Sequence, residues 1–326
     1  MTMRIAINGF GRIGRSVLRA WLEGGHEALE IVAVNDIARP DMAAYLFEYD
    51  SVFGPFRGEV RLEEGVLHVA GRKVRLTGAR DLATLDLSDI DLVMECTGLG
   101  GERSFAEAGL KAGARRVLVS GPSKTADVTL VLGANEADLR PEHRIVSNAS
   151  CTTNALAPLA RLIDATWGVE TGWMTTIHCY TGSQPTVDAP GPEFARSRAA
   201  ALSMVPTTTS AQRLLDVVLP GLAGRIEGAA VRVPVASVSA VDLTVMTRAK
   251  PDRAEVMRVL KEAGGVIGAT ERPLVSSDLR ARPESIVMAL PETHVTAGGL
   301  IRVFGWYDNE WGFSNRMLDV ALLMRA

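Results

Sequence analysis

One short glycine motif constrains the fold of this 326-residue chain more than any other feature. Near the N-terminus, the segment "INGFGRIGR" places Gly9, Gly11 and Gly14 in the spacing G-x-G-x-x-G. The motif follows a short apolar run with β-branched residues, and it opens a segment whose apolar residues have helical spacing. A strand, a tight turn and a helix in this order are typical of the first unit of a dinucleotide-binding α/β domain.

Each glycine of the motif has a physical role in that setting. Gly9 allows the tight turn, Gly11 lets the backbone approach a pyrophosphate at the helix N-terminus, and Gly14 lets helix and strand pack closely. The predicted cofactor loop also contains the residues between the glycines, which are Phe10, Arg12 and Ile13. The motif alone is weak because the chain has 31 glycines. A glycine-rich turn in a nucleotide-free domain is therefore the alternative.

An acidic residue at the end of the second predicted strand strengthens the prediction. The apolar run "EIVAVND" ends at Asp36, about 20 residues beyond the motif, where the ribose-binding acid of such domains usually lies. A carboxylate there accepts hydrogen bonds from a ribose 2′-OH and repels a 2′-phosphate. We therefore predict NAD rather than NADP as the cofactor, while the simpler alternative is that Asp36 is a surface acid in a turn.

The two halves of the chain have different strand and helix patterns. In the first half, apolar strands alternate with helices, which predicts a Rossmann-type doubly wound parallel sheet covered on both faces. In the second half, strands are longer and helices fewer, which predicts an α+β catalytic domain with a largely antiparallel sheet. We expect an NAD-binding domain over residues 1–150, a catalytic domain over 151–305, and a C-terminal helix over 306–326 that packs back on the NAD-binding domain.

Composition excludes several other classes of protein. The net charge is −3, which does not favour a nucleic-acid partner. No apolar stretch approaches the ~20 residues that a membrane span needs. The only cysteines are Cys96, Cys151 and Cys179, and such a sparse, odd set argues against a disulfide framework and for a reducing compartment. We expect a cytoplasmic protein without a membrane partner and without a metal site.

Cys151 is the candidate nucleophile. It lies in "SNASCTTN", after an apolar strand and before a segment with helical character, among residue types that cap helices. A thiol at a helix N-terminus feels the positive end of the helix dipole, which stabilises its thiolate. The alternative is that Cys151 is a small buried residue in a polar turn. Cys96 and Cys179 have apolar neighbours and are predicted to be buried structural residues.

His178 is the best candidate for the base that such a thiol needs. It ends the apolar strand "TTIHCYT", just before a long segment rich in Gly, Pro, Ser and Arg, whereas the other four histidines lie in charged or turn-like settings. Long loops of this kind inside compact domains are usually functional or disordered. A lone histidine in an apolar run is often only a hydrogen-bonded core residue, so spacing alone leaves both interpretations open.

Taken together, several segments resemble one enzyme family over essentially the whole chain. The segments "INGFGRIGR", "SNASCTTN", "TTIHCYT", "RSRAAALSMVPTTT", "VRVPVASVSAVDL" and "WYDNEWGFSNRM" resemble phosphorylating glyceraldehyde-3-phosphate dehydrogenase. The cysteine block and the closing block are highly specific, and the glycine motif is not. The closely related erythrose-4-phosphate dehydrogenases share most of these blocks.

The resemblance implies a mechanism and an assembly. Cys151 would attack the aldehyde of a phosphorylated sugar, with His178 as base, and hydride would pass to the nicotinamide to leave a thioester. Inorganic phosphate would then release an acyl phosphate. Asn309, in "YDNEW", would bind the nicotinamide carboxamide. The family also implies a homotetramer.

Two anion sites are implied as well, because the substrate phosphate and the attacking phosphate must both be held. The resemblance assigns Thr181 and Arg232 to the substrate phosphate. It assigns to the attacking phosphate, or to substrate binding nearby, Ser150, Thr152, Arg196, Thr209 and Ser210. Arginine forks and hydroxyl donors are the groups that bind phosphate. Arg232 also interrupts the apolar run "AAVRVPV", where an unpaired charge is costly.

The chain departs from the family pattern on the substrate side. Gly182 and Ser183 stand where the family usually has Asn-Asp, Ser210 stands where a glycine is usual, and Ala155 replaces a frequent second cysteine. The loop "DAPGPEFARSR" lacks the usual His-Lys-Asp before its arginines. These departures leave two alternatives open: the same chemistry on erythrose 4-phosphate or another phosphorylated aldehyde, and a paralogue that binds NAD without catalysis.

Overall fold

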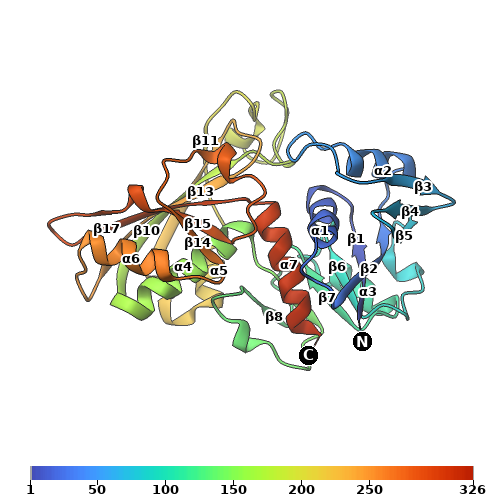
Figure 1. Cartoon of the computed structure of the whole chain (residues 1–326), viewed down its shortest axis with the longest axis horizontal. Helices are drawn as coiled ribbons and strands as arrows, with labels where there is room; N and C mark the ends of the chain where they lie inside the picture. Colours follow the sequence, from blue (N-terminus) through green and yellow to red (C-terminus); the bar gives the residue numbers. More distant parts are fainter. Residues whose placement is uncertain (1, 326) are drawn as a thin grey trace. The chain divides into compact units, whose positions relative to one another are not determined.

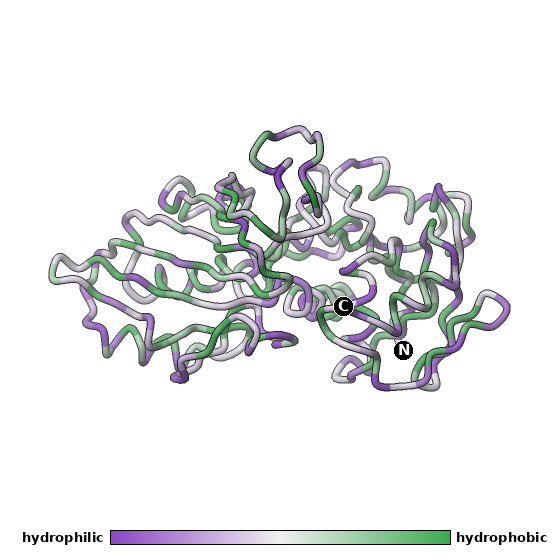
Figure 2. Tube along the Cα trace, turned by 90° about the horizontal axis from the view of Figure 1, so that it is seen from above, coloured by the Kyte–Doolittle hydropathy of each residue, from purple (hydrophilic) through white to green (hydrophobic). Residues whose placement is uncertain are grey.

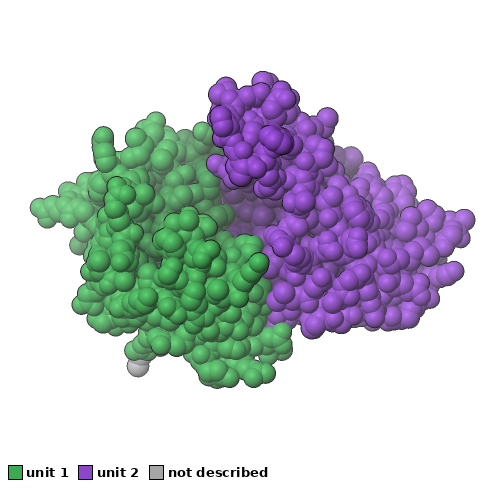
Figure 3. Space-filling view, turned by 180° about the vertical axis from the view of Figure 1, so that it is seen from behind, with its two compact units in different colours: residues 1–130, 136–149, 314–326 green, residues 131–135, 150–313 purple. Residues whose placement is uncertain are grey.

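The computed structural model describes residues 2–325, and these form two compact units (Figure 3). Unit 1 comprises Met1–Leu130, Glu136–Ala149 and Ser314–Ala326, and unit 2 comprises Val131–Asn135 and Ser150–Phe313. Within the described residues, no helix has the length and apolar character that crossing a bilayer requires. Hydrophobic residues, green in Figure 2, recur along the trace, and strand residues such as Ile7 and Leu243 are buried.

Unit 1 is built on a nine-stranded sheet in the order β3-β4-β5-β2-β1-β6-β7-β9-β8. Its strands are β1 (Met3–Asn8), β2 (Leu29–Asn35), β3 (Val60–Glu63), β4 (Val66–Val69), β5 (Arg72–Thr77), β6 (Leu92–Glu95), β7 (Arg116–Val119), β8 (Val128–Thr129) and β9 (Ile145–Ser147). All neighbours from β5 to β8 are parallel, and only β4 runs antiparallel to β3 and β5. The mostly parallel sheet predicted for this half is confirmed.

Helices cover both faces of this sheet. The helices are α1 (Arg12–Leu22), α2 (Pro40–Glu48) and α3 (Arg103–Lys111). Ile7 of β1 lies against Gly14 of α1, whereas its neighbour Ala6 clusters with Ala106 and Ala108 of α3. Because successive strand residues point to opposite faces, α1 and α3 lie on opposite sides of the sheet. This is the doubly wound arrangement that the sequence predicted.

The strand order of unit 1 determines where a ligand can bind. From β1 the chain moves to β2 on one side, and it returns to place β6 on the other side of β1. A crevice therefore opens at the carboxyl ends of β1 and β6, the switch point where ligands of open α/β sheets bind.

Unit 2 contains a second sheet, with strands ordered β11-β12-β10-β13-β17-β15-β14 and β16 paired to β17 (Figure 1). Its strands are β10 (Val169–Cys179), β11 (Val205–Thr207), β12 (Ile226–Val233), β13 (Ser239–Thr247), β14 (Ile267–Thr270), β15 (Ile286–Ala289), β16 (His294–Val295) and β17 (Ile301–Tyr307). Two neighbouring pairs, β10 with β12 and β14 with β15, are parallel, and the others are antiparallel. The largely antiparallel sheet predicted for this half is confirmed.

The helices of unit 2 are α4 (Cys151–Trp167), α5 (Ala211–Val218), α6 (Arg253–Glu262) and the start of α7 (Trp311–Met324). Three of them contact different strands of this sheet: α4 contacts β10, β13 and β15, α5 contacts β12, and α6 contacts β14. Along β10, Met174, Thr176 and His178 are buried, whereas Trp173, directly before them, is exposed. Pro158, whose position the sequence left undecided, lies inside α4.

Candidate active site

The turn that leads into α4 places Cys151 at a helix N-terminus. Ala149, two residues before the thiol, has a φ of 54°, a left-handed conformation that is unusual for a residue with a side chain. Ser150 then caps the helix, because its hydroxyl accepts a hydrogen bond from the Thr153 N–H at 3.1 Å. Cys151 is therefore the first residue of α4, as the sequence predicted.

His178 faces this thiol from the end of β10. The distance from Cys151 Sγ to His178 Nε2 is 3.6 Å. On the other side of the ring, Nδ1 lies 2.7 Å from the Cys179 carbonyl oxygen and 2.8 Å from Arg232 Nη1. Arg232 reaches this position because β12 pairs in parallel with β10 and puts Arg232 in register with His178. The structure thus brings together the three residues on which the predicted chemistry depends.

Burial sets the protonation of the pair. Burial raises the pKa of the Cys151 thiol above its ordinary value, although the positive charge of Arg232 opposes the shift. Burial, reinforced by the charge of Arg232, lowers the pKa of His178 to about 4. Burial therefore opposes the stabilisation of the thiolate that we expect from the helix dipole. Near neutral pH both groups are uncharged, and a neutral imidazole can take the thiol proton during attack.

A cavity of about 670 Å³ surrounds the Cys151–His178 pair. Of the residues predicted to bind substrate or phosphate, six line it: Ser150, Thr152, Arg196, Thr209, Ser210 and Arg232. Six lining residues were missed from the sequence: Thr176, Thr208, Gln212, Arg213, Gly228 and Ala230. Thr208, Gln212 and Arg213 lie within three positions of the predicted Thr209 and Ser210. The others alternate with His178 along β10 or with Arg232 along β12, and these positions were the available signal. Thr181 is not among the lining residues, and its hydroxyl lies 2.9 Å from that of Ser183.

The positive charges of the cavity are held in different ways. Arg196 Nε lies 2.9 Å from the Thr207 hydroxyl and 3.3 Å from the Glu193 carboxylate, so it is fixed at the rim. Arg232 is half-buried, and its Nε is a buried donor without a hydrogen-bond partner. Ser210 begins α5 without forming a side-chain cap. An anion would supply acceptors for such donors.

A buried tyrosine that the sequence did not single out supports the site from β17. The Tyr307 hydroxyl lies 2.9 Å from the Thr152 hydroxyl and 2.8 Å from the Thr176 hydroxyl. Its ring stands edge-on to His178 at a centroid distance of 6.1 Å. Burial raises the pKa of Tyr307 well above its usual range, so it remains a neutral hydrogen-bonding group. It ties α4, β10 and β17 together beneath the thiol.

Asn309 lies just after β17, and its side-chain amide is oriented by two donors. Its Oδ1 accepts hydrogen bonds from Cys179 Sγ at 3.1 Å and from Ser239 Oγ at 3.4 Å. Burial raises the pKa of Cys179 to about 12, so its thiol stays protonated. Cys179 is buried, as predicted. By donating to Oδ1 of Asn309, it also leaves the Nδ2 amide group of Asn309 as the donor for other partners.

The glycine loop of unit 1 has the shape that a dinucleotide requires. It lines a cavity of about 730 Å³ together with Asp36. Gly9 has a φ of 91°, and an added Cβ would lie 2.6 Å from the Thr97 backbone nitrogen. A Cβ on Gly14 would lie 2.1 Å from the Gly9 carbonyl oxygen, whereas one on Gly11 would meet nothing within 4 Å. Gly11 thus leaves open space at the start of α1 for a phosphate.

Asp36 lies at the cavity and also holds the glycine loop. Its Oδ2 accepts a hydrogen bond from the Phe10 N–H at 2.5 Å, and its Oδ1 accepts one from the Ala38 N–H at 2.8 Å. Two residues predicted to contact the cofactor have partners elsewhere in unit 1. The Arg12 guanidinium pairs with Asp50, and the Phe10 ring stacks on Phe47 at 5.9 Å. Their side chains support the loop, and Ile13 is half-buried.

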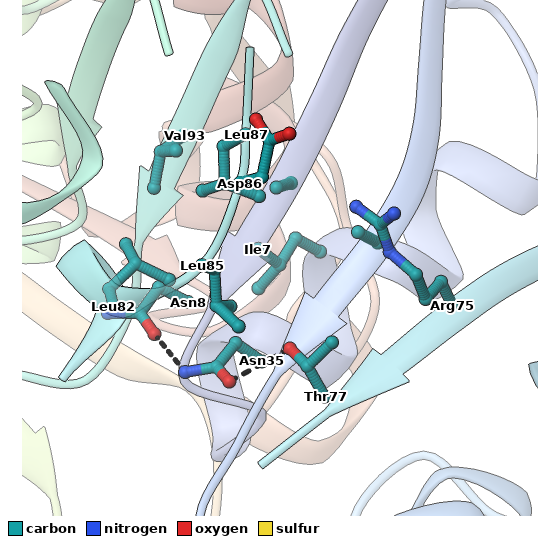
Figure 4. A pocket seen from close by; sticks show the side chains of 12 residues that line it. Ile7, Asn8, Asn35, Arg75, Thr77, Leu82, Leu85, Asp86, Leu87 and Val93 are labelled. Atoms are coloured by element: carbon teal, nitrogen blue, oxygen red, sulfur yellow. Dashed lines mark hydrogen bonds between the residues drawn. The ribbon is translucent and has the colours of Figure 1, made fainter. Parts of the chain in front are cut away.

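A chain of buried polar side chains ties together the carboxyl ends of four parallel strands below this site. Asn8 donates to Glu95 at 2.5 Å, Asn35 donates to Asn8 at 2.9 Å, and Thr77 donates to Asn35 at 2.9 Å. Asn8, Asn35 and Thr77 also line a smaller cavity of about 240 Å³ beside Arg75 (Figure 4). None of these residues was predicted from the sequence, because their partners lie on different strands.

Metal binding has no candidate within residues 2–325, where no three His, Cys, Asp or Glu side chains are grouped to hold an ion. Comparison with known proteins points instead to a nicotinamide enzyme. Residues 3–103 match the NAD binding domain of glyceraldehyde 3-phosphate dehydrogenase, and residues 150–309 match its C-terminal domain. The chain belongs to this family.

Full-length relatives agree with the domain matches. The chain is 48% identical over 332 residues to a glyceraldehyde-3-phosphate dehydrogenase of Pseudomonas aeruginosa, which covers 100% of this chain and 99% of the relative. It is 46% identical over 331 residues to one of Xanthobacter flavus, with 99% of both chains covered. This member of the glyceraldehyde-3-phosphate dehydrogenase family is therefore an NAD-dependent oxidoreductase that acts on an aldehyde.

The double role of Asp36 leads to a prediction about cofactor use. Asp36→Ala is expected to raise the KM for NAD about tenfold or more, because the variant loses a ribose acceptor and the anchor of the Phe10 N–H. Use of NADP should improve little, because the loosened loop holds any pyrophosphate poorly. Steady-state kinetics with both cofactors measure this, with Asp41→Ala, an exposed acid on α2, as control. An unchanged KM for NAD would contradict the assignment.

Proposed function

We propose that this enzyme oxidises glyceraldehyde 3-phosphate with NAD and inorganic phosphate to 1,3-bisphosphoglycerate, reversibly, through a thioester on Cys151. The observation that carries this proposal is the 3.6 Å contact between Cys151 Sγ and His178 Nε2 in a cavity lined by Arg196, Arg213 and Arg232. A thiol and a base in contact provide the covalent chemistry, and arginines around them suit a substrate and a co-substrate that both carry phosphate.

The reaction begins with attack of Cys151 Sγ on the aldehyde carbon. The thiol proton passes through His178 Nε2 to the carbonyl oxygen, which gives a thiohemiacetal. The backbone N–H at the start of α4 has no helical acceptor and can stabilise the developing oxyanion. When bound, NAD supplies the hydride acceptor. His178 takes the hydroxyl proton of the thiohemiacetal, and a thioester to Cys151 remains.

Phosphate attack on the thioester completes the reaction. The C–S bond breaks, the acyl phosphate leaves, and the sulfur of Cys151 recovers its proton. We assign the substrate phosphate to Arg232 and Thr181, and the attacking phosphate to Arg196, Thr209 and Ser150, with Ser210 and Thr152 beside them. For Asn309 we propose binding of the nicotinamide carboxamide through the amide end that Cys179 and Ser239 leave free.

NADH formation from glyceraldehyde 3-phosphate, with and without inorganic phosphate, tests this function. We expect steady turnover only when phosphate is present, because the thioester otherwise stays on Cys151. A steady rate that is indifferent to phosphate would refute phosphorolysis and favour hydrolysis of the thioester. Absence of any NADH, with NAD binding retained, would favour a role in NAD binding without catalysis.

The same chemistry on erythrose 4-phosphate is the second candidate. Gly182 and Ser183 replace the usual Asn-Asp, and the Thr181 hydroxyl is bonded to Ser183 rather than lining the cavity. This altered segment favours a different fit of the sugar chain. Comparison of kcat/KM for the two sugar phosphates decides between them, because pocket contacts act through transition-state binding.

We also propose that the enzyme is a cytoplasmic homotetramer. The loop between β10 and β11 has large apolar side chains in solvent, including Phe194 at 99% and Leu202 at 84% exposure. Such exposure usually marks a surface that a partner covers. Trp173, in a strand of the unit 2 sheet, is a further large apolar side chain that is exposed. The three cysteines are free, which supports a reducing compartment.

Assembly can be weakened through this loop. Phe194→Asp combined with Leu202→Asp is expected to reduce the solution mass from about four chains towards that of one 34.9 kDa chain, because burying two carboxylates in an apolar contact is costly. Light scattering after size exclusion gives the mass. Val217→Asp, an exposed apolar site on α5, is the control. A single-chain mass for the unmodified protein would contradict the proposal.

A further inference from the structure

Unit 1 contains a second, smaller cavity that the proposed reaction does not use. It has a volume of about 240 Å³, and one register row across four strands lines its floor: Arg75 of β5, Ala33 of β2, Ala6 of β1 and Val93 of β6. The segment 82–87 lines its other side. Because alanines occupy the middle of the row, the sheet does not fill the space beneath that segment. We call this space the small cavity.

The small cavity is apolar at its centre and polar at its two ends. Large apolar side chains line the centre, namely Ile7, Leu82, Leu85, Leu87 and Val93. At the carboxyl ends of the strands, the Thr77 hydroxyl donates to the Asn35 side chain at 2.9 Å. Figure 4 shows the charged ends of Arg75 and Asp86 on the side of the cavity away from Asn35 and Thr77. Any ligand here meets an apolar surface with two opposite charges at its exposed end.

These two charges are available to a ligand. Both side chains are exposed, and within residues 2–325 the Arg75 guanidinium has no hydrogen-bond or ion-pair partner. Asp86 Oδ1 accepts the Ser88 N–H at 3.0 Å. Hydrogen bonds from Ser88 hold the pKa of Asp86 below its ordinary value, and the charge of Arg75 adds to this shift. The two charges therefore act on each other without direct contact, which leaves room for a bridging group.

Size and charge together select the class of ligand. A volume of about 240 Å³ holds roughly eight water molecules, or a ligand of about nine non-hydrogen atoms. An aliphatic α-amino acid has this size, an apolar tail, and a carboxylate and an ammonium group on one carbon. A nucleobase is neutral and would leave both charges without partners, and a sugar phosphate would place hydroxyls against the leucines at a cost in free energy.

We propose that the small cavity binds an aliphatic α-amino acid and that its occupation strengthens NAD binding. The carboxylate of the ligand accepts hydrogen bonds from the Arg75 guanidinium, and its ammonium group donates to Asp86. Its tail lies between the alanines of the sheet and the leucines of segment 82–87. The site is independent of which aldehyde the enzyme oxidises.

The coupling to NAD follows from a wall that two cavities share. Asn8, Asn35 and Leu82 line both the small cavity and the cavity of the glycine loop. Asn35 also holds Ala79, a residue of the second cavity, through hydrogen bonds of 2.8 Å and 2.9 Å to its backbone. A tail packed against Leu82 and Asn35 occupies the space into which this wall could relax. It therefore favours the conformation that lines the cofactor cavity.

The first test measures binding of L-leucine to the NAD-free protein by calorimetry. We expect a Kd below about 1 mM. Isovalerate lacks the ammonium group and 3-methylbutylamine lacks the carboxylate, so each should bind at least about tenfold more weakly. Failure of L-leucine to saturate a site at about 10 mM, or equal binding of either singly charged analogue, would overturn the proposal.

Variants of the two charges locate the site. Arg75→Gln and Asp86→Asn change exposed side chains, so both proteins should fold, and each should weaken L-leucine binding about tenfold or more. Lys73→Gln removes an exposed charge of the same strand outside the cavity and should bind as the unmodified protein does. Ala33→Leu should fill the cavity and abolish binding, with retained NAD binding as the check that it folds. Unchanged binding in both charge variants would contradict the site.

The coupling is tested by NAD binding without turnover. Saturating L-leucine should lower the Kd for NAD about fivefold, and saturating NAD should lower the Kd for L-leucine by the same factor. Weaker NAD binding would place the amino acid in the cofactor cavity, and an unchanged Kd would remove the coupling; either result overturns the proposal. If glyceraldehyde 3-phosphate is not a substrate, the proposed function fails while these binding measurements keep their meaning.

Discussion

Cys151→Ala is expected to abolish NADH formation, with a loss of about 10⁴-fold or more in kcat, because no other group near the aldehyde can carry the acyl intermediate. Helix α4 should persist, since Ser150 caps it through Thr153 and alanine is a good helix residue. Steady-state assays with saturating cofactor and phosphate measure the loss. Mass spectrometry should find an acyl adduct of the unmodified enzyme, when phosphate is withheld, that the variant lacks.

The control for this variant is Cys96→Ala. Cys96 is a buried thiol of unit 1, and burial raises its pKa to about 12, so it is unreactive and its loss should leave kcat nearly unchanged. Cys179→Ala is a less suitable control, because Cys179 donates to Asn309. Retention of more than a hundredth of the activity in Cys151→Ala would exclude a covalent intermediate on this thiol.

The fold could be predicted largely from local patterns. The G-x-G-x-x-G segment, the apolar strands that alternate with helices, and the position of Asp36 all depend on residues close in sequence, and each was found where expected. The change to longer strands in the second half indicated a different sheet. Such patterns fix the type of each element, because side-chain periodicity follows directly from strand and helix geometry.

The chemistry at Cys151 could be predicted only in part. Residue types indicated Cys151 and His178 as candidates. Their 3.6 Å contact, however, depends on how α4 packs against β10 in the folded unit. The register of Arg232 with His178 depends on two strands more than fifty residues apart. Neither the Tyr307 network nor the direction of the Cys151 pKa shift was visible, because burial is a property of the assembled site. The role of Thr181 stays a prediction.

His178→Gln is expected to lower kcat by about 10² to 10⁴, the usual contribution of a positioned general base. Glutamine has a similar reach but cannot take a proton, so the thiol must lose its proton to water. The loss should shrink at high pH, where the thiolate forms without a base. His294→Gln, an exposed histidine on β16, should keep full activity. A variant with unchanged kcat at neutral pH would remove His178 from the mechanism.

The same substitution should change the acid stability of the protein in a direction that the His178 pKa fixes. Burial lowers that pKa to about 4 from 6.5, so between these values the unfolded chain binds a proton that the folded chain does not. Keeping His178 neutral therefore contributes fully to the free energy of unfolding above pH 6.5. This contribution, at most about 3 kcal/mol, is lost as the pH falls towards 4. Urea unfolding at fixed protein concentration should show a shallower loss of stability over this range in His178→Gln. Equal slopes in both proteins would mean that His178 titrates normally and that its burial does not hold it neutral.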